Sequence, residues 1–159
     1  MINLETKYMG LQLKNPIIIA SSGLTNSVEK IKDLEKAGAG AVVLKSIFEE
    51  QINNEVNSQI NRQPQHIFPE EEDYIWNYTR NPLITHHLNL LSEAKKETEI
   101  PIIASISCMS ASEWIVFAKD LENAGADALE LNLFFVPTDP HKTSEEIEQL
   151  YLRIVSEVK

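Results

Sequence analysis

Four short apolar runs of the chain end on small or polar residues that could do chemistry. In chain order these residues are Ala20, Ser21 and Ser22, then Lys45 and Ser46, then Ser105, and finally Asn132. In a barrel of repeated strand–helix units, residues at the carboxyl ends of the strands bind ligands and carry out catalysis. These positions are therefore the first candidates for a binding site.

Lys45 is the charged member of this set. It follows the apolar residues 41–44, and a lysine at the end of a buried strand is costly unless it meets an anion or a polar ligand. Its amine could form a Schiff base with a carbonyl substrate, or its charge could lie beside an electron-rich ring. A lysine that only reaches solvent from the strand end is the alternative.

The other candidates offer hydrogen bonds. Small residues at 20–23 would let a flat ring lie against donating backbone amides, although a plain turn has the same composition. Glu130 and Asn132 stand two apart, so they share one face of a strand. Polar groups that point into a barrel need partners, which makes this pair a stronger signal than a serine in a turn.

Acid–base and metal chemistry have weaker support. Asp139 and His141 lie in the segment after Asn132, where capping residues are also common. Cys108 is the single cysteine, and no histidine stands at a spacing typical of a cysteine nucleophile. His86 and His87 are merely adjacent, so we predict no metal site.

Composition restricts the class of protein. A chain of 159 residues can form one domain with a substantial core, and its formal net charge of −10 argues against nucleic acid or an anionic membrane as partner. One cysteine excludes an internal disulfide framework, the first residues lack a secretory signal, and no apolar run approaches a spanning helix. We predict a cytoplasmic protein that binds a small-molecule substrate.

The hydrophobic pattern predicts a hairpin at 3–14 followed by four strand–helix units. The expected strands are 17–20, 41–44, 100–106 and 128–132, and the expected helices are 26–36, 83–98, 111–125 and a last one from 143 almost to 159. Strands separated by helices pair in parallel. Residues 49–82 are rich in Asn, Gln and Glu, and we expect a long insertion or lid loop there.

The repeated pattern favours a (β/α)8 (TIM) barrel within the α/β class. Segments that begin at Lys32 and Lys119 are identical at nine of sixteen positions, and no Gly-x-Gly-x-x-Gly follows a strand. Because closure takes eight strands, residues 1–159 are predicted to be the N-terminal half of a single barrel domain, its first four βα units plus the hairpin. A missing C-terminal half or a partner, such as a second copy, would complete it. A four-stranded open sheet is the alternative.

Four motifs together resemble the dihydroorotate dehydrogenase family, most closely its soluble members. They are Asn15-Pro16 with Ala20-Ser21, the run 37–46, the run 101–105 and the run 125–132. The resemblance implies an FMN-dependent oxidoreductase that converts dihydroorotate to orotate in pyrimidine biosynthesis. It also implies that the flavin lies along Ala20 and Ser21, contacts Lys45 and Ser46 with its ring, and has Ser105 and Asn132 nearby. We add Ser22, which stands where the family commonly has glycine, to the predicted flavin contacts.

The chain departs from that family at the position of the catalytic base, where it carries Phe135. Phenylalanine cannot abstract a proton, which leaves Thr138, Asp139 and His141 as candidates and opens the choice between dihydroorotate and a related CH–CH substrate. Barrel phosphate sites lie after the seventh and eighth strands, so we expect residues 1–159 alone to bind FMN weakly and to be inactive.

Two other functions stay open at this stage. One is a Schiff-base lyase of the aldolase type that uses Lys45. The other is a non-catalytic half-barrel that assembles with a partner chain. The electron acceptor and the oligomeric state have no signature in the sequence.

Overall fold

The computed structural model of the protein describes residues 2–61, 69–108 and 111–159. Its strands are β1 (Thr6–Tyr8), β2 (Leu11–Leu13), β3 (Ile18–Ile19), β4 (Ala41–Val43), β5 (Ile47–Phe48), β6 (Ile102–Ser107) and β7 (Ala128–Leu131). Its helices are α1 (Val28–Lys36), α2 (Glu49–Asn61), α3 (Pro69–Glu97), α4 (Ala111–Asn123) and α5 (Ser144–Val158). Among these helices, none is both long enough and apolar enough to cross a membrane.

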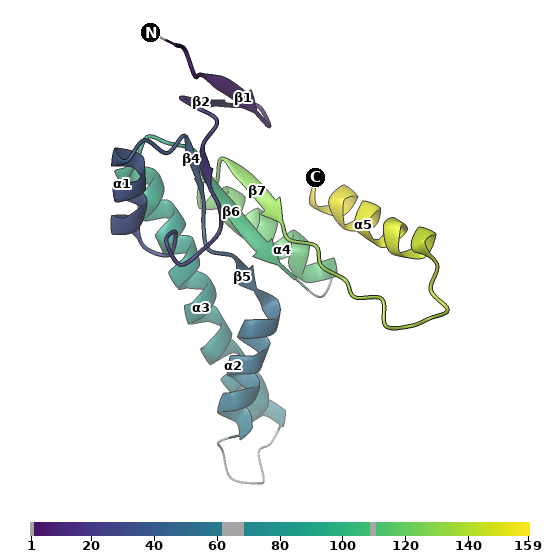
Figure 1. Cartoon of the computed structure of the whole chain (residues 1–159). Coiled ribbons are helices and arrows are strands. Elements are labelled where there is room, and N and C mark those ends of the chain that lie inside the picture. Colours follow the sequence, from purple (N-terminus) through teal and green to yellow (C-terminus); the bar gives the residue numbers. More distant parts are fainter. Residues whose placement is uncertain (1, 62–68, 109–110) are drawn as a thin grey trace.

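A parallel sheet forms the centre of the molecule (Figure 1). β3 pairs with β4, β4 pairs with β6, and β6 pairs with β7, all in parallel. The short β5 pairs with the same edge of β6 as β4, because Ile106 of β6 has Ile47 on one side and Leu131 on the other. The predicted α/β architecture with parallel strands in chain order is confirmed.

The segment formed by β4 and β5 carries one more residue than the part of β6 with which it pairs. Val43 pairs with Ile103, whereas Ile47 pairs with Ile106, so four steps along the chain from β4 to β5 face three steps along β6. An extra residue of this kind is a β-bulge, which bends a strand and redirects its side chains. The bulge lies at residues 44–46 and therefore at the predicted site.

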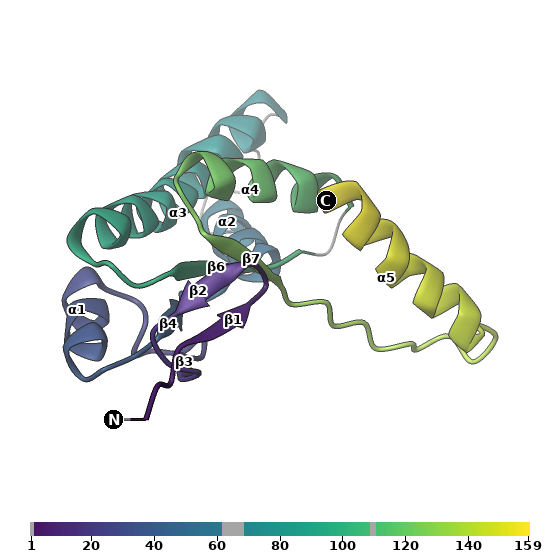
Figure 2. The same ribbon diagram turned by 90° about the horizontal axis from the view of Figure 1, so that it is seen from above.

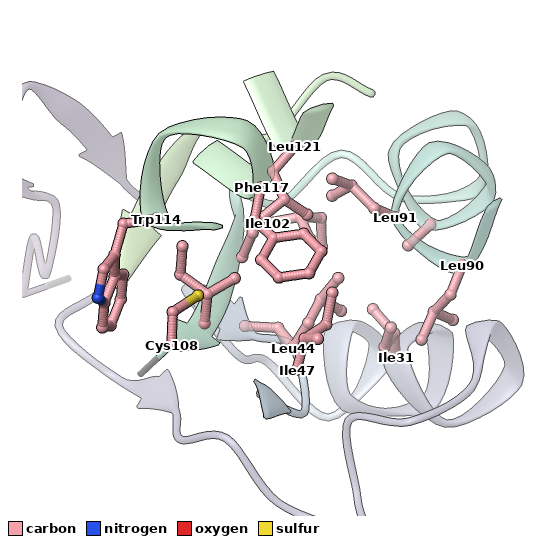
Figure 3. Packing of buried hydrophobic residues seen from close by; sticks show 14 of the residues in the cluster. Ile31, Leu44, Ile47, Leu90, Leu91, Ile102, Cys108, Trp114, Phe117 and Leu121 are labelled. Carbon is pink, nitrogen blue, oxygen red and sulfur yellow. The ribbon is translucent and has the colours of Figure 1, made fainter. Parts of the chain in front are cut away.

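Helices cover one face of the sheet and build the main core (Figure 2). Alternate strand residues such as Val42, Ile102 and Ala104 are fully buried against them. Figure 3 shows how the helix side chains fill this layer, with Trp114 and Phe117 of α4 and Leu91 of α3 the largest members. Cys108 lies buried in the same core.

The N-terminal hairpin covers the start of the opposite face. β1 and β2 pair antiparallel, as expected for 3–14, and Leu13 of β2 is buried against Ala41, Val43 and Ile103. This second cluster is small, so the strand residues that lie further along the same face have no apolar cover from the hairpin. Those residues include the polar candidates of the sequence.

The prediction of a long insertion or lid loop at 49–82 is wrong for the residues that the structure describes, and its part at 62–68 lies outside them. Residues 49–61 form α2, and residues 69–82 form the first half of α3, which continues through Pro82 to Glu97. α2 packs against α3, with Ile52 and Val56 buried against the core that Leu90 and Leu91 help to form. The apolar stripe of α2 is only these few residues wide, and tertiary packing stabilises the helix rather than its own periodicity.

Glycine turns end the two repeated helices. Gly38 after α1 has φ 102 and Gly125 after α4 has φ 97, backbone angles that favour glycine. A capping box opens the last helix, since Thr143 and Glu146 bond reciprocally at the start of α5. These local signals explain why most element boundaries follow the sequence pattern.

Candidate functional site

The predicted residues lie at or near the carboxyl ends of the parallel strands. Ala20 and Ser21 follow β3, Lys45 and Ser46 lie in the bulge between β4 and β5, Ser105 lies in β6, and Asn132 follows β7. Parallel strands place their carboxyl ends at one edge of a sheet. Residues that are far apart in the sequence therefore share one edge, as the barrel pattern predicted.

A row of hydroxyl groups crosses the sheet at this edge. Ser21 Oγ lies 3.0 Å from Ser46 Oγ, and Ser46 Oγ lies 2.7 Å from Ser105 Oγ. Ser105 Oγ donates to a carboxylate oxygen of Glu130 at 2.6 Å. The backbone N–H of Ser46 donates to Ser21 Oγ at 3.0 Å and joins the first two strands a second time. We call these four residues the serine–glutamate row.

Strand geometry explains why the row forms. Ser105 alternates with Ala104 and Ile106, both in the helix-covered core, and so points to the other face. Glu130 likewise alternates with Leu129 and Leu131. Leu44 and Ile47 both point into the helix-covered core although they are three positions apart. The extra residue between them lets Ser46 point to the opposite face, where Ser105 lies.

Lys45, next to Ser46 in the bulge, and Asn132, directly after β7, are both exposed. Each is held through its backbone: the Lys45 N–H donates to the Thr25 carbonyl at 3.3 Å, and the Asn132 N–H donates to the Ile106 carbonyl at 2.8 Å. Within the described part of the chain, neither side chain makes a hydrogen bond or ion pair. Their polar groups are accessible to a ligand.

Ser22 makes turn contacts instead of joining the row. Its N–H donates to Thr25 Oγ1 at 3.2 Å, and its own Oγ accepts from the N–H of Leu24 at 3.2 Å. Thr25 is fully buried and donates to the Ser22 carbonyl at 3.1 Å. This turn fixes the backbone that carries Ala20 and Ser21, and Thr25 had no sequence signal beyond its position after Gly23.

Glu130 was noted in the sequence only as a residue on the same face as Asn132. In the structure Glu130 of β7 lies opposite Ser105 of β6 and accepts its hydroxyl hydrogen. The sequence signal for Glu130 was its position two residues before Asn132. What the sequence lacked was the register of β6 against β7, which places the carboxylate beside a buried hydroxyl.

The acid–base candidates lie apart from the row, in the loop before α5. Phe135 is half-buried and packs edge-on against Tyr151, with ring centroids 5.4 Å apart. Thr138, Asp139 and His141 are exposed, and a carboxylate oxygen of Asp139 accepts the backbone N–H of His141 at 2.9 Å. Asp139 and His141 thus form a local turn, and the described structure gives Thr138 no contact with the row. Of the residues described, no three His, Cys, Asp or Glu side chains group as metal ligands.

The fold and site define an α/β protein whose candidate ligand site lies at the carboxyl edge of a parallel sheet. Comparison with known proteins identifies the family. The sequence profile of dihydroorotate dehydrogenase matches residues 3–158, and the chain belongs to that family. The family named from the four sequence motifs is therefore confirmed.

Several curated relatives support this assignment. The chain is 33% identical over 138 residues to the catalytic subunit of dihydroorotate dehydrogenase B (NAD(+)) from Thermoplasma volcanium, a match that covers 84% of the chain and 42% of the relative. It is 37% identical over 125 residues to the corresponding subunit from Methanocella arvoryzae, covering 78% of the chain and 38% of the relative. The chain thus spans about two fifths of the length of these relatives.

Proposed function

We propose that this chain forms part of an FMN-binding (β/α)8 barrel in a dihydroorotate dehydrogenase-like oxidoreductase. The observation that carries the proposal is that Lys45 and Asn132 are exposed at the same carboxyl edge of a parallel sheet as the hydroxyl row. Ligands of TIM-barrel enzymes bind at that edge. The family relationship makes FMN the ligand to test first.

The residues present fit a flavin ring. The ring system carries carbonyl oxygens and ring nitrogens that accept hydrogen bonds, together with one N–H that donates. Lys45 offers an ammonium and Asn132 offers an amide NH₂ as donors, and Ala20 exposes a small surface on which a flat ring can lie. The row supplies oxygens that accept. Hydrogen-bond donors and acceptors that match those of the ring are thus available at one edge of the sheet.

Each residue then has a distinct task. With a flavin bound, the charge of Lys45 would favour negative charge on the ring, which is how a protein tunes a cofactor that accepts hydride. Asn132 would orient the ring or the substrate through its amide. Ser21 and Ser46 would hold the ring edge, the buried Ser105 would hold Ser46, and the turn at Ser22 would keep the backbone of Ala20 close to the ring.

The proposed reaction is the oxidation of a CH–CH bond to C=C. A base would remove one proton from the substrate, and the bound flavin would supply the acceptor for the hydride of the neighbouring carbon. Phe135 cannot be the base, so the proton acceptor lies on the 138–141 loop or elsewhere in the protein. The substrate is dihydroorotate or a related compound with a CH–CH bond.

We propose that further strands complete the barrel beyond the described parallel sheet, which consists of the short strands β3 to β7. Eight strands close such a barrel, and the chain matches only about two fifths of the length of its relatives. Further residues of the relatives, or a second chain, would supply the other strands and the phosphate loops. We therefore expect residues 1–159 alone to bind flavin weakly and to lack turnover.

Weak binding can be measured by NMR. Titration of FMN into the ¹⁵N-labelled chain should shift the amide signals of Ser21, Ser46 and Asn132. Lys45→Met should weaken the affinity about tenfold, because it removes a charged donor. Lys7→Met, on the hairpin strand β1, is the matched control and should bind like the unmodified chain.

Two results would count against the proposal. One is the absence of shifts at the strand ends at millimolar FMN, and the other is an equal loss of affinity in Lys7→Met. Trapping of a carbonyl substrate on Lys45 by borohydride would instead favour the Schiff-base lyase.

A further inference from the structure

The direction of the hydrogen bonds in the serine–glutamate row follows from its last member. Ser105 Oγ donates its single hydrogen to the Glu130 carboxylate, which as an ion can only accept. Ser105 therefore has no hydrogen left for Ser46, so Ser46 Oγ must donate across the 2.7 Å contact. By the same reasoning Ser21 Oγ must donate to Ser46 Oγ across 3.0 Å.

The opposite end of the row agrees with this order. Ser21 Oγ accepts the backbone N–H of Ser46 at 3.0 Å, a bond that leaves the hydrogen of Ser21 free to point toward Ser46 Oγ. Every hydroxyl hydrogen thus points toward β7, and one carboxylate sets the direction across four strand positions. Ser105 is fully buried, so water cannot replace its partners.

We propose that Glu130 is a positioning residue that turns the row into a set of hydrogen-bond acceptors facing the ligand. With their hydrogens directed along the row, the half-buried Ser21 and Ser46 can offer only lone pairs to a bound molecule, while the fully buried Ser105 links them to Glu130. The ligand edge that meets the row must therefore carry donors. This inference rests on the proposed function: for a flavin, the donors are the ring N–H and the hydroxyls of its ribityl chain.

The first test follows the row without any flavin. In a pH titration of the chain, the backbone amide of Ser46 should shift with the same midpoint as the side-chain carboxyl carbon of Glu130. In Ser105→Ala the carboxyl carbon should still titrate, while the Ser46 amide should no longer follow it. A Ser46 amide that ignores Glu130 in the unmodified chain, or still follows it in Ser105→Ala, would overturn the proposal.

The second test measures FMN affinity by NMR in Glu130→Gln, Ser105→Ala and the double variant. Glutamine has the size of glutamate but adds a donor, so it lets the row reverse, and a role in packing alone would leave affinity unchanged. Each single variant should weaken FMN binding about tenfold, and the double variant should bind no more weakly than either, because both changes break the same row. Glu148→Gln, exposed on α5, is the control.

The two tests separate the two claims. If the unmodified chain binds no FMN, the proposed flavin function fails, and the pH titration still decides the direction of the row. If FMN binds and Glu130→Gln binds it equally well, the flavin function stands and the positioning role of Glu130 is wrong.

Discussion

Gly40 and Asn15 lie so close that a methyl group on Gly40 would overlap the backbone oxygen of Asn15. The same contact region carries three hydrogen bonds: Gly40 N–H to the Ile17 carbonyl at 2.8 Å, Asn15 Nδ2 to the Gly38 carbonyl at 2.8 Å, and Ile17 N–H to Asn15 Oδ1 at 3.0 Å. Two motifs of the sequence, Asn-Pro and the glycine turn, therefore meet where β3 starts beside β4.

Gly40→Ala should destabilise the protein strongly. The added carbon meets backbone atoms, which cannot move aside without shifting β3 against β4, and overpacking of this kind costs about 1–3 kcal/mol or more. Gly23→Ala is the matched control, because nothing lies within 4 Å of a carbon added there. Urea unfolding of both variants measures the difference. Equal stabilities would contradict the packing of Asn15 against Gly40.

Asp127→Ala should also be costly. One Asp127 carboxylate oxygen accepts the backbone N–H of Ile102 at 2.7 Å and the ammonium of Lys95 at 2.6 Å, so this side chain ties α3 to the starts of β6 and β7. We expect a loss of about 1–3 kcal/mol in the free energy of unfolding, because the Ile102 N–H loses a charged acceptor.

Two further variants divide that loss. Lys95→Met removes the ion pair but keeps the bond to Ile102, so it should cost less than Asp127→Ala. Asp33→Ala breaks an exposed ion pair with Lys36 and should cost under about 0.5 kcal/mol. A Lys95→Met loss as large as that of Asp127→Ala would show that the ion pair, and not the backbone bond, carries the effect.

His87 should make the stability depend on pH. Burial, with a smaller contribution from the charge of the neighbouring His86, lowers the pKa of His87 on α3 to about 4. Between about pH 6.5 and pH 4 the unfolded chain binds a proton at this residue while the folded chain does not. Stability should therefore be lost as the pH falls through this window, by up to about 3 kcal/mol from this group.

His87→Leu should remove that part of the pH dependence. The His87 Nε2 atom is buried without a hydrogen-bond partner among the described residues, so leucine loses no known polar contact. Chemical denaturation at pH 7 and pH 5 compares the variant with the unmodified chain and with His86→Leu, which changes an exposed residue. A His87→Leu variant that loses as much stability at pH 5 as the unmodified chain would show that His87 is already protonated in the fold.

Riboflavin should bind residues 1–159 about as well as FMN does. In (β/α)8 barrels the phosphate lies on loops after the seventh and eighth strands, and the proposed site of this chain meets only the ring and the ribityl chain, which riboflavin shares with FMN. Parallel NMR titrations with the two ligands measure both affinities. An FMN affinity more than fivefold higher would place a phosphate contact within this chain.

Local chemistry made much of the fold predictable. The β-branched run at Ile17–Ile19 and the glycines at 38 and 125 mark strands and turns by their own conformational preferences. The α2–α3 region was missed because its buried residues are few in each turn, and the helices form against the core instead of on their own periodicity.

The sequence by itself determined which residue types stand at the strand ends, and hence the parallel sheet, the family and the candidates Lys45, Ser46, Ser105 and Asn132. Only the tertiary structure decided how they meet. The bulge at 44–46 brings Ser46 to the face of Ser105, and the register of β6 against β7 sets Glu130 beside it. Pairing register depends on contacts between residues 25 to 59 positions apart, which a linear pattern does not encode.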